Sequence, residues 1–129
     1  MSNAKSYRLG DLQLKIMKVL WERGESAVGD VLQALGADAD LAYTTVATML
    51  RKMEGRGLVQ HVSEGRRFLY RAVVSPDAVT RSMADDILER LFEGRLSDLL
   101  SHLLSTREVS REELAELERL IAQKRKKQS

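Results

Sequence analysis

The stretch LAYTTVATMLRKMEGRGLVQHVSEGRRFLYRA, residues 41–72, changes its hydrophobic period partway along, and this change decides the fold. From about residue 42 to residue 55 the apolar side chains recur with the 3.6-residue period of an α-helix. Over 58–62 and 68–72 the sequence instead has two short runs rich in Val, Leu, Phe and Tyr, as strands do. A glycine-containing segment, 63–67, joins the two runs, so the stretch predicts a helix followed by a β-hairpin.

Two more helical patterns precede this stretch. Apolar residues at helical spacing predict a helix from about Asp11 to a stop at Gly24, and another over Val28–Leu35. A short extended piece, 25–27, lies between them, and 37–40 is a predicted turn. Three short helices, a small strand after the first and a closing hairpin follow the order of a winged helix-turn-helix, in which the hairpin is the wing.

The chain's only proline, Pro76, opens a second region that is helical throughout. Capping signals and apolar spacing predict helices over about 76–93, about 96–104 and from Ser110 to about Arg125. The predicted fold class is therefore mainly α with a small β-hairpin, plus a C-terminal helical dimerisation region. We expect a winged-helix domain over 8–74, a helical domain over 75–125, and flexible ends at 1–7 and 126–129.

Composition argues against several classes of protein. The chain has no cysteine, which excludes disulfides, thiolate metal sites and cysteine nucleophiles. No apolar run approaches the ~20 residues that span a bilayer, and no signal-peptide pattern is present, so we expect a cytoplasmic protein without membrane insertion. Glycine-rich phosphate loops, HExxH and nucleophile elbows are also missing, so we expect neither an enzyme nor a cofactor. The two histidines, His61 and His102, are more simply structural than a metal pair.

Charge is unevenly distributed although the net charge is only +2. Six basic residues stand against two acidic ones within Arg51–Arg71, whereas residues 73–123 hold 11 acidic residues against 6 basic ones. The tail 124–127 is basic throughout. A basic patch on a nearly neutral protein is typical of a polyanion site, and the alternative is an ordinary solvated face.

The helix around Tyr43–Met53 divides into two faces when it is projected at 100° per residue. One face is apolar and suits docking on the preceding helices: Val46, Met49, Leu50 and Met53. The opposite face is polar and basic: Thr44, Thr48, Arg51 and Lys52, with Thr45 just beyond. Hydroxyls, threonine methyls and a guanidinium suit base edges in a DNA major groove. The alternative is a threonine-rich solvent face, although threonine is a poor helix former if solvent is its only neighbour.

Two other basic groups are candidates for the DNA backbone. Arg66 and Arg67, at the predicted wing tip, suit a phosphate or the minor groove, unless they only keep the turn soluble. Lys5 and Arg8, in the N-terminal arm, are weaker phosphate candidates.

The C-terminal helices carry more apolar surface than they can hide among themselves. The candidate dimer interface comprises Ile87, Leu88, Leu91, Phe92, Leu96, Leu99, Leu100, Leu103, Leu104, Leu114, Leu117 and Leu120. Burial of each such side chain stabilises by about 1.5–3 kcal/mol. We therefore expect a two-fold homodimer, the alternative being a monomer whose C-terminal helices fold back on the winged helix.

Three segments resemble the penicillinase and methicillin-resistance repressors of the BlaI/MecI type: LGDLQLKIMKVLW (9–21), LAYTTVATMLRKMEGRGLV (41–59) and RRFLYRAVVS (66–75). The most specific piece is Tyr43-Thr44-Thr45-Val46, and the resemblance covers nearly the whole chain. It implies a homodimeric winged-helix transcriptional repressor. The N-terminal domain of such a repressor binds a palindromic operator, and its C-terminal helices hold the dimer.

The resemblance also implies roles for particular residues. Base contacts fall on Thr44, Thr45, Ala47 and Thr48, and Ala47 stands where staphylococcal-type members have arginine, which leaves the operator sequence open. In the resistance systems a membrane sensor with a metalloprotease domain triggers cleavage, and the bond here that matches their Asn-Phe bond is His102-Leu103. A copper-responsive branch (CopY type) carries a cysteine-rich motif that this chain lacks.

Two functions follow as hypotheses: a sequence-specific transcriptional repressor, and a winged-helix protein–protein interaction module that binds no DNA. The basic helix and wing favour the repressor. The candidate DNA-contacting residues are Tyr43, Thr44, Thr45, Ala47, Thr48, Arg51, Lys52, Arg66, Arg67 and Arg8. The expected partners are double-stranded operator DNA, a second copy of the chain and a membrane sensor protease system.

Overall fold

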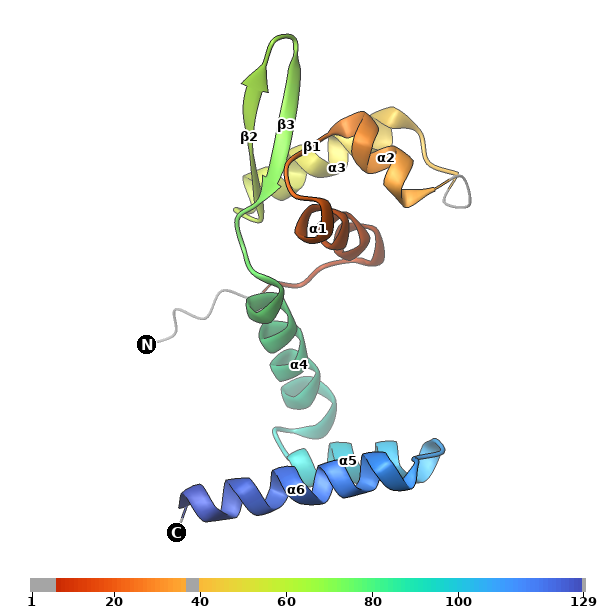
Figure 1. Ribbon diagram of the computed structural model, residues 1–129, viewed down its shortest axis with the longest axis vertical. Helices are drawn as coiled ribbons and strands as arrows, with labels where there is room; N and C mark the ends of the chain where they lie inside the picture. The colour runs from red at the N-terminus through yellow and green to blue at the C-terminus, as the bar shows by residue number, and fades with distance from the viewer. Residues whose placement is uncertain (1–6, 37–39, 129) are drawn as a thin grey trace. The chain divides into compact units, whose positions relative to one another are not determined.

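In the computed structural model, residues 7–36 and 40–128 are described. Within them the elements follow one another along the chain as Figure 1 shows: α1 (Asp11–Arg23), β1 (Ser26–Ala27), α2 (Val28–Leu35), α3 (Tyr43–Gly55), β2 (Val59–Glu64), β3 (Arg67–Ala72), α4 (Pro76–Phe92), α5 (Leu96–Thr106) and α6 (Arg111–Gln128). The prediction of a mainly helical chain with a small hairpin, in winged-helix order, is confirmed.

An apolar core joins the first three helices to the small sheet. Helical spacing puts its fully or almost fully buried members on one side of each helix: Ile16, Met17 and Leu20 in α1, Val31 in α2, and Val46, Leu50 and Met53 in α3. The sheet adds Val59 and Tyr70, and α4 adds Val79. Burial of each large apolar side chain stabilises by about 1.5–3 kcal/mol, so this core is the main source of stability for the helices and the sheet that it joins.

Two hydrogen bonds attach the start of α4 to the core. The indole Nε1–H of Trp21 donates to the carbonyl of Val74 at 2.8 Å. The backbone N–H of Tyr7 donates to the hydroxyl of Ser82 at 2.9 Å.

The chain divides into two compact units between Asp86 and Ile87, whereas the sequence pattern put the boundary at the start of α4.

The sheet has the strand order β1-β3-β2 and is antiparallel throughout. β1 pairs with β3 only at Ser26–Tyr70 and Ala27–Leu69. The hairpin formed by β2 and β3, here called the wing, is paired to Glu64–Arg67, so Gly65 and Arg66 alone make its turn. The predicted strands 58–62 and 68–72 with a loop at 63–67 were therefore too short. A glycine at φ 64° lets a two-residue turn follow the twist of the strands, which extends the ladder.

The second unit consists of the end of α4, α5 and α6. α4 ends at Phe92, and the left-handed residues Glu93 (φ 51°) and Gly94 (φ 79°) turn the chain. The Ser110 hydroxyl accepts the N–H of Glu113 at 3.0 Å, which confirms the predicted cap of the last helix. No side chain of α5 or α6 is buried within the chain.

The predicted ends need correction. The last helix continues to Gln128, past its predicted end near Arg125 and into the segment that was predicted to be flexible. Basic side chains in a last turn complement the helix dipole. Similarly, α5 runs to Thr106 rather than Leu104. Of the predicted flexible start, Tyr7 is hydrogen-bonded as above, and 1–6 lie outside the described residues, as do Ser129 and most of the predicted turn at 37–40.

Candidate nucleic-acid interface

Helix α3 offers a polar face to solvent while its other face is fixed in the core. Val46, Leu50 and Met53 are fully buried, and Met49 is half-buried against them. The predicted polar residues are exposed: Thr44, Thr45, Thr48, Arg51 and Lys52. The structure thus confirms which residues lie on each face of the helix. The exposed face keeps its position because the opposite face is packed in the core.

A second row of α3 residues turns toward the wing. Tyr43, Ala47 and Arg51 are spaced by four residues and therefore lie along one side of the helix. They line a hollow of about 300 Å³, here called the α3–wing hollow. Its other lining residues come from β1, α2 and the wing: Ala27, Val28, Arg66, Arg67, Phe68 and Tyr70. The hollow therefore brings five predicted DNA-contacting residues together, from α3 and from the wing.

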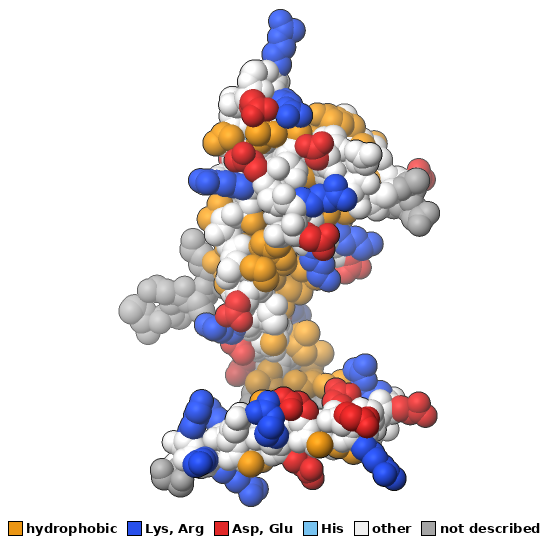
Figure 2. All heavy atoms as spheres, in the orientation of Figure 1, with side chains coloured by type: hydrophobic (Ala, Val, Ile, Leu, Met, Phe, Trp, Pro, Cys, Tyr) orange, Lys and Arg blue, Asp and Glu red, His pale blue; other side chains and the backbone are white. Residues whose placement is uncertain are grey.

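The basic groups around the hollow differ in their partners. At the wing tip, where Figure 2 shows basic side chains in blue, the guanidinium of Arg67 lies 3.1 Å from the Glu64 carboxylate. Within the described residues, Arg51, Lys52 and Arg66 make no ion pair. Exposed cations that make no ion pair suit a polyanion, because binding need not break an existing pair.

Burial changes the chemistry of Tyr70 at the floor of the hollow. Desolvation raises the pKa of the Tyr70 hydroxyl above its ordinary 10.0, and the negative charge of Glu54 adds to this, while Arg51 opposes it. The hydroxyl is therefore neutral at physiological pH. Tyr70 and Phe68 were not predicted as site residues, although they occupy alternate positions of one strand, which places both on the same face of the wing.

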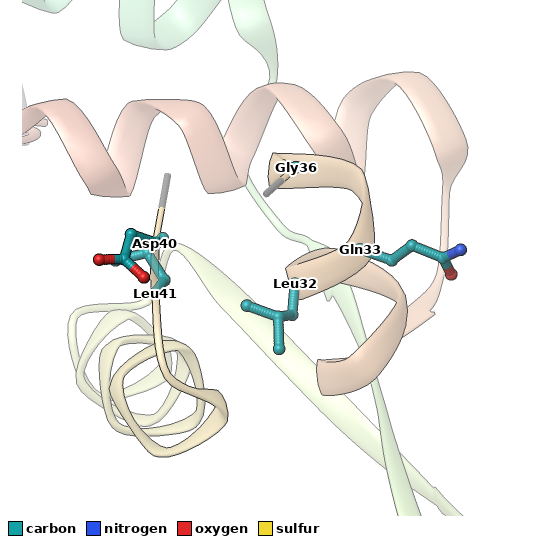
Figure 3. A pocket seen from close by; sticks show the side chains of 5 residues that line it. All are labelled: Leu32, Gln33, Gly36, Asp40 and Leu41. Carbon is teal, nitrogen blue, oxygen red and sulfur yellow. The ribbon is translucent and has the colours of Figure 1, made fainter. Parts of the chain in front are cut away.

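Other predicted site residues lie away from the hollow. The guanidinium of Arg8 lies 3.4 Å from the Asp86 carboxylate on α4. The backbone carbonyl of Arg8 accepts a hydrogen bond from the Arg56 guanidinium at 2.7 Å. Arg8 is thus a link between the N-terminal arm and α4 within the first unit. Lys5 lies outside the described residues. A further hollow, lined by Leu32, Gln33, Gly36, Asp40 and Leu41 where α2 leads to α3, contains no predicted site residue (Figure 3).

The two histidines have different surroundings. His61 on β2 is bonded to the Glu54 carboxylate, with Nδ1 2.8 Å from each carboxylate oxygen. His102 belongs to α5 in the second unit, with its ring centroid 6.1 Å from that of Phe92. Among residues 7–36 and 40–128, no three His, Asp or Glu side chains are grouped so as to hold a metal ion. In that part of the chain no helix has both the length and the apolar character for crossing a bilayer.

The second unit leaves most of the predicted dimer residues uncovered. Seven are exposed in the single chain: Ile87, Leu91, Leu96, Leu103, Leu104, Leu114 and Leu120. The other five are half-buried: Leu88, Phe92, Leu99, Leu100 and Leu117. His102 and Leu103, the predicted cleavage position, are both exposed and lie inside α5 rather than in a loop.

Comparison with known proteins shows the family of the chain. A family model described as penicillinase repressor matches residues 9–123. The penicillinase repressor of Bacillus licheniformis is 25% identical over 114 residues, covering 88% of this chain and 89% of its own length. Transcriptional regulator BlaI of Mycobacterium tuberculosis is 40% identical over 86 residues, which is 66% of this chain and 62% of that relative's length.

A solved structure is similar to the first part of the chain. The solution structure of the DNA-binding domain of the repressor BlaI matches with a TM-score of 0.51 at 27% identity, covering 57% of this chain and 90% of that one. The relatives are transcriptional repressors and not enzymes, in agreement with the lack of catalytic motifs in the sequence.

Proposed function

The chain belongs to the penicillinase repressor family, and we propose that it is a homodimeric transcriptional repressor that reads a palindromic DNA operator through α3 and the wing. The observation that carries this proposal is the exposed α3 face. Thr44, Thr45 and Thr48 are exposed on a helix whose opposite side is packed in the core. Basic residues flank these threonines.

The proposed contacts divide into two classes. The threonines of α3 and Ala47 face the base edges in the major groove, where a good side-chain–base pair discriminates by about 1–3 kcal/mol. Arg51, Lys52 and the wing arginines neutralise phosphates, which fix the register of the protein on the duplex without reading sequence. Tyr43 lies at the edge of the hollow, 56% exposed, where its ring and hydroxyl can pack against the sugar-phosphate backbone.

Dimerisation through the second unit is supported by what that unit leaves exposed. α5 and α6 have no buried side chain of their own, yet α5 carries leucine at positions 96, 99, 100, 103 and 104, and α6 carries it at 114, 117 and 120. A second copy would cover these side chains, and a two-fold dimer presents two copies of α3 to two related half-sites. We therefore propose that the second unit, which begins at Ile87, holds the dimer together.

Relief of repression by cleavage is a further part of the proposal, suggested by the family resemblance. The candidate bond joins His102 and Leu103, which are exposed. The carbonyl of His102 accepts from the hydroxyls of Ser105 (3.1 Å) and Thr106 (2.8 Å), so α5 must open locally before a protease can bind this bond. If immunoblots of induced cells show only intact chain, cleavage is not the mechanism.

A DNA titration over a salt series tests the proposed function. Fluorescence anisotropy of labelled duplex, with full-length protein at several salt concentrations, gives the slope of log affinity against log salt. Each neutralised phosphate contributes about −0.9 to this slope. We expect binding with a clearly negative slope. If the protein binds no duplex at low salt, the winged helix serves another purpose, such as the protein–protein interaction considered from the sequence.

A further inference from the structure

The end of α3 is bonded to the wing through one carboxylate. Glu54 accepts from the ring Nδ1 of His61, which lies 2.8 Å from both carboxylate oxygens. The backbone N–H of His61 donates to the same carboxylate at 3.3 Å. Because an ionised carboxylate only accepts, Nδ1 carries the proton in this bond. Two donors of one residue thus fix β2 to the last turn of α3.

This bond lies where the sheet changes from three strands to two. His61 is opposite Tyr70, and Tyr70 is opposite Ser26 of β1, so three strands are present at this level. Only β2 and β3 remain beyond Leu69. An isolated two-stranded hairpin is marginally stable in water, so the outer wing depends on contacts at its base for its direction.

Aromatic stacking connects His61 to the outer part of the wing. The rings of His61 and Phe68 are stacked, with centroids 4.0 Å apart and an angle of 22° between planes. Phe68 belongs to the outer, two-stranded part of the wing and lines the α3–wing hollow. It directly follows Arg67 and the turn residue Arg66. A continuous series of contacts therefore runs from Glu54 to the wing arginines.

We infer that Glu54 and His61 are positioning residues, which hold the wing at a fixed angle to α3 so that both engage one DNA duplex together. This inference rests on the proposed DNA-binding function and adds two residues to it that touch no DNA. Without the bond, the wing arginines sample positions from which they miss their phosphates, while the threonines of α3 still meet the bases.

The sign of the expected effect separates positioning from simple electrostatics. Glu54 is an acidic residue close to a surface that we expect to bind a polyanion. If its charge were its only influence, replacing it would strengthen DNA binding. If its role is to hold the wing, Glu54→Ala weakens binding although a negative charge has been removed.

Four variants of the full-length chain test this inference by anisotropy over a salt series. Glu54→Ala removes the acceptor; Glu54→Gln makes the same charge change but keeps an oxygen that accepts from His61. His61→Phe keeps a ring to stack on Phe68 but removes the donor. Glu22→Ala, which removes an exposed acid on α1, is the charge control.

We expect Glu54→Ala and His61→Phe to bind DNA about 5- to 30-fold more weakly, with a salt slope less negative by about 1–2 for each half-site. Glu54→Gln should restore most of the affinity and the slope, and Glu22→Ala should bind as the wild type or more tightly. Because the wing amides should lose protection once the bond is gone, hydrogen exchange in the wing should be faster in Glu54→Ala than in Glu54→Gln. Thermal unfolding of the variants should stay within about 8 °C of the wild type, as expected for the loss of one surface interaction.

The outcomes distinguish the inference from the function on which it rests. If the wild type binds DNA and Glu54→Ala has the same slope and wing exchange as Glu54→Gln, the positioning role is wrong and the proposed function stands. If the wild type binds no duplex at low salt, the proposed function fails and the inference fails with it.

Discussion

Replacing Leu91 by asparagine should weaken the dimer by a predictable amount. A leucine gains about 1.5–3 kcal/mol on full burial. Leu91 is 71% exposed in the single chain, so about 1–2 kcal/mol remains to be gained at a partner. A two-fold dimer contains the residue twice, and the loss is therefore about 2–4 kcal/mol, or roughly a 30- to 1000-fold rise in the dissociation constant.

Asparagine suits this test because it nearly matches leucine in shape and adds no charge. Its lower helix propensity affects monomer and dimer alike and so largely cancels in the dissociation constant. Sedimentation equilibrium over a range of protein concentrations measures that constant. Val73→Thr is the matched control, since Val73 is 53% exposed but belongs to the first unit, and it should leave the constant unchanged. A wild-type chain that stays monomeric, or a Leu91→Asn dimer as tight as the wild type, would refute the reasoning.

Three further predictions concern the first unit. Thr48→Ala should reduce discrimination between duplex sequences, whereas Arg67→Ala should weaken binding to all sequences similarly and make the salt slope less negative by about 1. Competition titrations measure both effects. An equal loss of discrimination in both variants would contradict the division of contacts. Trp21→Phe removes the 2.8 Å indole hydrogen bond and should lower the free energy of unfolding by about 1 kcal/mol. This corresponds to a fall of about 4–8 °C in Tm, measured by circular dichroism. An unchanged Tm would show that the bond adds no stability. Because burial raises the pKa of Tyr70 above 10.0, the unfolded chain loses this proton first, so the free energy of unfolding should fall as pH rises past about 10 in denaturant titrations. The fall should be smaller in Tyr70→Phe, and an identical pH dependence in that variant would contradict the assigned cause.

Local patterns predicted the elements well because they depend on neighbours in the chain. The change from period 3.6 to period 2 after residue 55 marked the end of α3 and the start of the wing. The same periodicity identified Val46, Leu50 and Met53 as core residues. The wing strands were predicted too short, since their length depends on pairing across the hairpin, and serine, glutamate and arginine carry little strand signal at its tip.

Contacts between distant segments were not predictable from one sequence. The hollow depends on the register that puts Tyr70 opposite Ser26, 44 positions earlier in the chain. His61 was predicted to be structural because it lies on the wing, about 40 residues from the other histidine, and only the structure shows its bond to Glu54. The pairing of Arg8 with Asp86 joins the arm to α4, and nothing in the local sequence around either residue indicates it.

Selection from a random double-stranded DNA pool tests the central claim most directly. Full-length protein is incubated with the pool, bound duplexes are amplified over several rounds, and the enriched sequences are read. A homodimer that reads DNA through α3 and the wing should enrich a palindrome whose half-site centres lie about 10 base pairs, or a multiple of this, apart. A pool that stays random at low salt, or an enriched sequence without two-fold symmetry, would contradict the account.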